Sequence, residues 1–133
     1  MTKEQAIRTA ANWWAEKLKE RQPHSNGDNS PASVLACLLA DLRTDEVTEE
    51  KLKLFKAALE REIQEHTTRY PGCMISLHSD YGPGMMLFEA AVEAGIPLIN
   101  FPFKTSLFIT ENGDDFAVKV FDGYGSAAFE LQP

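Results

Sequence analysis

Basic residues are almost absent from the second half of this chain. Of the 13 lysines and arginines, only Lys104 and Lys119 lie beyond residue 70, where they accompany eight acidic residues. The formal net charge of −7 therefore resides almost wholly in residues 71–133. This distribution argues against a protein that binds the phosphate backbone of nucleic acid, so we expect no direct nucleic-acid binding. It allows a protein partner with a basic surface, although acidic surfaces also keep small proteins soluble.

Cysteines and long apolar runs are scarce as well. Cys37 and Cys73 lie in apolar stretches without the spacing of a metal site, so we expect buried free thiols, no metal and no cofactor. No run approaches the ~18 apolar residues of a membrane span, and the first residues lack the apolar core of a signal peptide. We therefore expect a cytoplasmic protein that does not contact membranes. With 133 residues, 44% of them hydrophobic, residues 1–133 should form a single domain.

The first helix should begin at a capping box. Thr2 and Gln5 have the spacing at which a threonine hydroxyl and a glutamine amide each satisfy a free backbone N–H. The apolar positions that follow recur at helical intervals and place Trp14 in the core. Trp13 then falls at the edge of the core, where it either packs or serves as a recognition aromatic.

Two further helices are predicted before residue 70. Residues 31–43 are apolar on almost every side, which is typical of a central helix. Thr48 has the position of an N-cap for the next helix, which should run to His66 or Arg69. The buried stripe expected on that helix consists of Leu52, Phe55, Leu59 and Ile63.

The stretch from residue 73 to residue 95 predicts a strand, a turn and a helix. Residues 73–77 form an apolar run of the kind that a covered strand needs. A Gly/Pro turn at residues 82–84 should end it, and a helix should start at Met85. Gly95 stands where a left-handed C-terminal cap is expected.

The last third of the chain has the pattern of antiparallel strands. Residues 96–103 contain two prolines, so they should be irregular or an edge strand. Residues 105–110 and 116–121 flank an Asn-Gly pair, a strong hairpin pattern, and residues 128–131 have the composition of a last strand. The fold class predicted is α+β, with three N-terminal helices and one later helix packed on a small, mostly antiparallel sheet of three to four strands.

Polar side chains at the end of the predicted strand at 73–77 suggest a site. His78 and Asp80 would face the same side of a continuing strand and share a proton, as in a small hydrolase, but Asp80 has the position of a helix cap too. The turn from Tyr81 to Gly84 could instead present backbone amides to a small anion such as a nucleotide signal, provided that Arg61 or Arg69 reaches it.

Acidic and aromatic side chains suggest a protein-binding surface instead. Up to four carboxylates of the predicted hairpin, those of Glu111, Asp114, Asp115 and Asp122, would face one direction and meet a basic partner. The aromatic side chains exceed what the helical core needs, so those left exposed in one patch would mark an interface, such as that of a homodimer. The aromatic residues in question are Trp13, Phe101, Phe103 and Tyr124.

The order of these motifs resembles that of small uncharacterised proteins of phages and prophages in gut Firmicutes. The resemblance covers most of the chain and departs at FPFKT, where a tryptophan is expected between proline and lysine. It rests on TKEQAI and WW, then NGD, SDYGP, EAAVEAGI, FPFKTSLFI and FDGYGSA. The resemblance implies a non-enzymatic protein that binds and blocks a host component, most plausibly an inhibitor of a bacterial defence system. It implies no catalytic residue.

Overall fold

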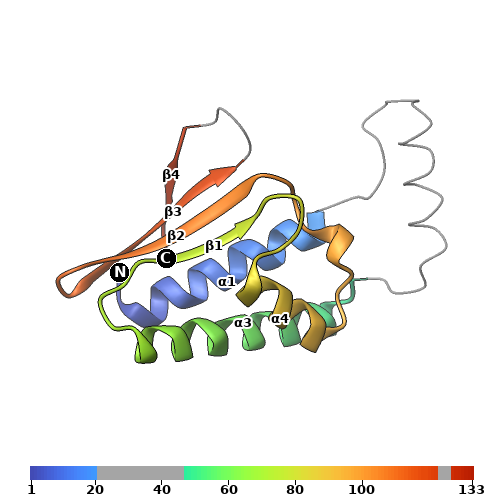
Figure 1. The fold of residues 1–133 in the computed structure, drawn as a ribbon, viewed down its shortest axis with the longest axis horizontal. Coiled ribbons are helices and arrows are strands. Elements are labelled where there is room, and N and C mark those ends of the chain that lie inside the picture. Colours follow the sequence, from blue (N-terminus) through green and yellow to red (C-terminus); the bar gives the residue numbers. More distant parts are fainter. Residues whose placement is uncertain (21–46, 123–126) are drawn as a thin grey trace.

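The computed structural model of the protein describes residues 1–20, 47–122 and 127–133. The predicted helix at 31–43, with Cys37, and the predicted site residue Tyr124 lie outside these residues. The elements, shown in Figure 1, follow one another as α1 (Lys3–Glu20), α3 (Glu49–Arg69), β1 (Ile75–Ser79), α4 (Met85–Ala94), the 3₁₀ turn η1 (Leu98–Asn100), β2 (Thr105–Asn112), β3 (Asp115–Asp122) and β4 (Phe129–Leu131).

The four strands form one antiparallel sheet in the order β1-β2-β3-β4. Its helix-facing side is apolar, because alternate residues such as Leu77, Leu107 and Val120 are buried. Helix α1 packs on β2 and β3, α4 packs on β1, and α3 packs against both helices (Figure 1). The α+β class and the four-stranded antiparallel sheet are thereby confirmed, with two N-terminal helices and one later helix in the described part of the chain.

Capping residues in the sequence correctly predict where α1 and α3 begin. The Gln5 N–H donates to the Thr2 hydroxyl over 3.2 Å, and the Thr2 N–H donates to the Gln5 side-chain oxygen over 2.9 Å. The Thr48 hydroxyl likewise accepts from the Lys51 N–H. These bonds satisfy backbone donors that a helix start leaves without an intrahelical partner.

The core is centred on aromatic rings from three parts of the chain. Trp14 of α1 and Phe55 of α3 both contact Phe101, with ring centroids 6.3 and 6.1 Å apart, and all three are buried. Trp13 lies half-buried at the edge of this core, as expected, with the Lys17 ammonium over its ring. Phe101 therefore belongs to the core rather than to a surface patch.

The first strand differs from the prediction in position and in burial. It starts at Ile75 rather than at Cys73, because the turn that ends α3 extends through Gly72, whose φ is +81°. The Cys73 thiol is consequently exposed, so the expectation of a buried thiol there is wrong. The strand is also covered on one face only, since Ser76 and His78 are exposed. The alternation shows that β1 is not buried on both faces, and the strand order makes it an edge strand that pairs with β2 alone.

The hairpin of β2 and β3 follows the prediction and is longer by a few residues. Asn112 pairs with Asp115, so the loop consists of Gly113 and Asp114. Gly113 has a φ of +65°, which glycine adopts without the steric cost of a Cβ. Residues 96–103 are irregular apart from η1, as one of the two predicted alternatives required.

Candidate functional site

His78 and Asp80 stand at the end of β1, where the chain folds back into α4. The Gly84 N–H donates to the His78 carbonyl over 2.8 Å, and the Asp80 N–H donates to the Gly82 carbonyl over 3.2 Å. No hydrogen bond or ion pair joins the two side chains in the described structure. The N-cap of α4 is Gly84, so the interpretation of Asp80 as the cap is wrong. The hydrolase hypothesis thus has no acid–imidazole pair to build on.

Glycine is favoured at position 84 by lack of space and not by backbone conformation. Its φ of −68° suits any residue. A Cβ there would lie 3.0 Å from the His78 Cε1 atom and 3.1 Å from the His78 carbonyl oxygen. The absence of a side chain therefore lets the imidazole lie against the first turn of α4.

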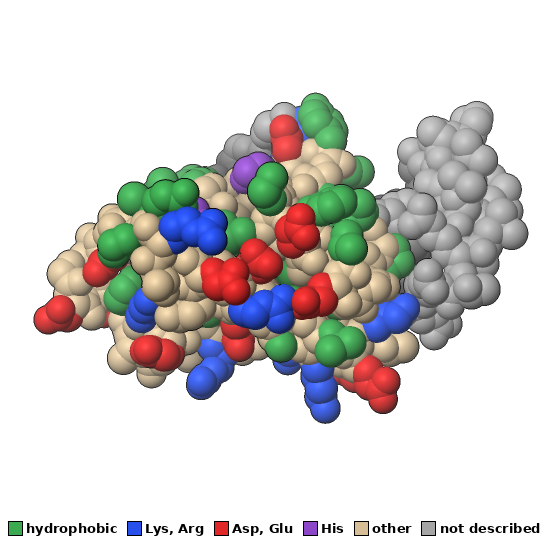
Figure 2. Space-filling model, turned by 60° about the horizontal axis from the view of Figure 1, so that its bottom comes forward, with side chains coloured by type: hydrophobic (Ala, Val, Ile, Leu, Met, Phe, Trp, Pro, Cys, Tyr) green, Lys and Arg blue, Asp and Glu red, His purple; other side chains and the backbone are tan. Residues whose placement is uncertain are grey.

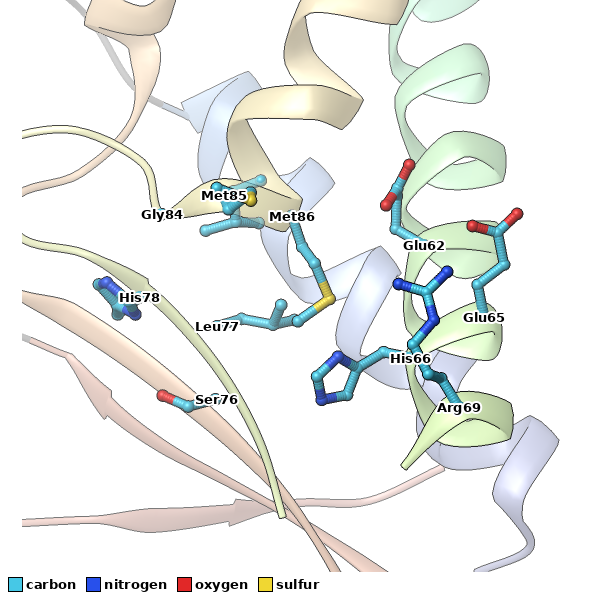
Figure 3. A pocket seen from close by; sticks show the side chains of 11 residues that line it. Glu62, Glu65, His66, Arg69, Ser76, Leu77, His78, Gly84, Met85 and Met86 are labelled. Carbon is cyan, nitrogen blue, oxygen red and sulfur yellow. The ribbon is translucent and has the colours of Figure 1, made fainter. Parts of the chain in front are cut away.

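A groove runs between β1, the C-terminal half of α3 and the first turn of α4. Figure 3 shows His66, Leu77 and Met86 pointing into the space between these elements. Its volume of about 340 Å³ is near the lower end of the range for ligand pockets. We call it the β1 groove; it is lined by Glu62, Glu65, His66, Arg69, Ser76, Leu77, His78, Gly84, Met85, Met86 and Leu87.

The charged groups of the β1 groove have both signs. Arg69 lines it, as the anion hypothesis requires, and its guanidinium forms no hydrogen bond or ion pair within the described residues. Arg61 does not line it, because its guanidinium binds the Glu93 carboxylate at 2.6 Å, which raises the pKa of Arg61. Glu62 and Glu65 also line the groove. An anion would therefore meet one arginine and two carboxylates.

The outer face of α4, at the mouth of the groove, carries exposed apolar side chains beside two exposed glutamates. Met85, Phe88 and Val92 have 81%, 42% and 59% of their surface accessible. Their spacing of three and four residues places them on one side of the helix. Figure 2 shows hydrophobic side chains gathered mostly along the upper margin of this side of the molecule, above a mixture of acidic and basic groups. This α4 face, Met85, Phe88 and Val92, was missed as a site from sequence, although the apolar composition of residues 85–94 signalled it.

The four carboxylates predicted to form one acidic surface lie at two ends of the hairpin. Glu111 and Asp114 are exposed at the tip, where Asp115 bonds to the Met1 ammonium group, which lowers the pKa of the Asp115 carboxyl. Asp122 lies at the other end, opposite Thr105, and accepts from Lys17 over 2.7 Å. A single direction for all four is therefore wrong, because the eight-residue strands separate them.

The aromatic residues predicted to form one patch are also dispersed. Phe103 is 54% exposed, whereas Phe101 is buried. Tyr81 is exposed beneath the Lys104 ammonium, 5.1 Å from its ring centroid. Tyr124 lies outside the described residues. The expected residues therefore do not form a single exposed patch among the described residues, and the homodimer stays a prediction.

The described residues contain neither a metal site nor a membrane span. Within residues 1–20, 47–122 and 127–133, no three His, Cys, Asp or Glu side chains are grouped so that they could hold a metal ion. Among the helices described, none has the length and hydropathy needed to cross a bilayer. No protein-family model matches the sequence, and no curated protein matches it either.

Proposed function

We propose that this protein acts by binding another protein through the α4 face. The observation that carries the proposal is the exposure of Met85, Phe88 and Val92 on a helix whose opposite side is already buried. Exposed apolar side chains that gather in one patch mark protein-interaction sites, and here the patch is flanked by Glu89 and Glu93. The described residues cover only the inner side, formed by Leu87, Ala90, Ala91 and Ala94.

Burial of the α4 face would supply the free energy of association. Covering one large apolar side chain contributes roughly 1.5–3 kcal/mol, before the entropy lost on association is subtracted. Phe88 has the aromatic character that is enriched at the centres of interfaces. The open face of the sheet is a weaker candidate, because Phe108 and Phe121 there contact each other and polar residues surround them.

The proposed class of partner rests on the sequence resemblance alone. Resemblance to phage proteins supports a host protein as partner, and an inhibitor of a bacterial defence system as the role. Glu111 and Asp114, exposed and without a partner among the described residues, support an accessory contact with a basic surface. Sequestration of a small anionic nucleotide is the alternative that Arg69 supports. Glu62 and Glu65 beside it make a protein partner the better proposal.

A capture experiment with two matched variants tests the proposal. Phe88→Asp places a charge on the α4 face, whereas Phe129→Asp changes a residue of nearly equal exposure, 44%, on β4 at the opposite edge of the sheet. The tagged protein and both variants are incubated with host lysate, and bound proteins are quantified by mass spectrometry. We expect wild type and Phe129→Asp to retain the same protein, and Phe88→Asp to lose it. Equal retention by the two variants would refute the role of the α4 face.

A further inference from the structure

The free edge of β1 faces the β1 groove. β1 is the first strand of the sheet, so only one of its sides pairs with another strand, β2. The bridge between Ser79 and Pro83 covers the end of the other side. Because the His78 carbonyl accepts from the Gly84 N–H, the backbone groups of residue 78 point away from β2. In an antiparallel ladder, alternate residues point the same way, so those of Ser76 do too.

Three backbone groups are consequently left at this edge. They are the N–H and C=O groups of Ser76 and the N–H group of His78, and no described residue hydrogen-bonds to them. Ser76 and His78 are exposed and both line the groove. A row of unpaired N–H and C=O groups on an edge strand is the feature to which an extended chain adds by main-chain hydrogen bonds.

The walls of the groove suit the side chains of such a segment. A strand added beside β1 would turn alternate side chains toward the helices, where Leu77 and Met86 point into the groove and His66 and Arg69 stand on the opposite wall (Figure 3). Its other side chains would face the exposed side of the sheet, beside Ser76 and His78. Met85 lines the groove and belongs to the α4 face as well, so a single partner would be able to contact the β1 groove and the α4 face together.

We propose that the β1 groove takes an extended peptide segment of the partner protein, which pairs with Ser76 and His78 as an added edge strand. This inference rests on the proposed function, and it names the form in which the partner binds. The segment carries an apolar side chain toward Leu77 and Met86. Its main chain supplies the remaining contacts with the edge of β1.

Hydrogen exchange and a random heptapeptide display library test the inference on the full chain. In the free protein, the amides of Ile75 and Leu77 should be protected by β2, and those of Ser76 and His78 should exchange rapidly. A peptide selected from the library should protect the amides of Ser76 and His78. Of the three free groups only the Ser76 C=O accepts a hydrogen bond, because the His78 C=O already accepts from Gly84. N-methylation of the one peptide residue that donates to Ser76 should therefore weaken binding by about tenfold or more, and N-methylation of the two adjacent residues should not.

A pair of variants at one position separates the backbone from the side chain. Ser76→Pro removes the free N–H without removing a ladder bond, and Ser76→Ala keeps that N–H. We expect only Ser76→Pro to lose the peptide, with the fold of both checked by circular dichroism. The N-methylated peptides give the same test without altering the protein.

The outcomes distinguish this inference from the proposed function. If the selected peptides do not bind the Phe88→Asp variant but bind the Ser76→Pro variant normally, strand addition is overturned and the α4 face remains as the binding surface. A library that returns no binder, or a loss of binding on N-methylation that is not confined to one peptide position, would also overturn strand addition. Self-association that Ser76→Pro abolishes would assign the edge to a second copy of the chain instead of a partner peptide. Equal capture by Phe88→Asp and Phe129→Asp would refute the proposed function itself.

Discussion

The β1 groove and the tip of the β2–β3 hairpin differ in how far their polar groups are used within the chain. At the tip, Asp115 bonds to the Met1 ammonium group, and the Phe116 N–H donates to the Met1 carbonyl. At the groove, the guanidinium of Arg69 and the backbone of Ser76 have no partner among the residues described. Both regions are exposed, but only the groove combines unused hydrogen-bonding groups with an apolar surface.

This difference bears on what each region would contribute to the proposed binding. Exposed carboxylates in high dielectric contribute mainly to the rate of encounter and are screened by salt. Apolar side chains and unpaired main-chain groups that become buried contribute to the lifetime of a complex. We therefore assign affinity to the groove with its α4 face and, at most, steering to the hairpin tip.

The largest effect is expected from closing the groove at Gly84. Gly84→Ala would set a Cβ 3.1 Å from the His78 carbonyl oxygen, a backbone atom that cannot move freely. We expect the free energy of unfolding to fall by about 1–3 kcal/mol, as overpacking does. Urea denaturation measures it. Gly82→Ala is the matched control, since a Cβ there meets nothing within 4 Å. Equal stability of the two variants would show that the His78 imidazole and the turn before α4 move aside at little cost in free energy, so that this end of the groove is not rigid.

A smaller effect, on rate alone, is expected from reversing charge at the hairpin tip. Glu111→Lys with Asp114→Lys leaves the ion pair of Asp115 intact. With a basic partner, association at low salt should slow by up to about tenfold, with little change in dissociation. Stopped-flow mixing at two salt concentrations measures both rates. A rate that depends neither on salt nor on the variant would remove the hairpin from the binding surface.

The smallest effect is expected on the free energy of unfolding as a function of pH in the acidic range. The Met1 ammonium lowers the pKa of Asp115 below its ordinary 3.8, chiefly through their hydrogen bond. A lowered carboxyl pKa means that the pair stabilises the fold above pH 3.8 and that this contribution disappears as the pH falls through the lowered value. Asp115→Asn should therefore be slightly less stable than wild type at neutral pH and equal to it in strong acid. Asp114→Asn, without such a partner among the described residues, should match wild type throughout.

Local patterns were sufficient for much of the fold. The starts of α1 and α3 followed from Thr2 and Thr48, because a cap involves residues only three positions apart. Gly95 ends α4 with a φ of +73° for a similarly local reason. The β2–β3 hairpin followed from Asn-Gly between two strand-forming segments.

The candidate site depended on contacts that no local pattern contains. Which side of α4 is buried was ambiguous in sequence, since apolar residues occur on both sides, and packing against α3 and β1 selected the alanine side. The position of β1 was missed by two residues because the turn at Gly72 competes with the apolar run. The carboxylates of Asp114 and Asp122 were close in sequence, yet the length of β3 places them at opposite ends of the hairpin.

Neighbouring residues and composition were sufficient to predict the helix caps, the β2–β3 hairpin and the acidic character of the second half. By contrast, the position of Arg69, Ser76 and Gly84 around one groove, and of the free edge of β1 beside it, depends on tertiary packing. Strand order and helix packing join residues far apart in the chain, and the free energy that selects those pairings is a property of the whole core.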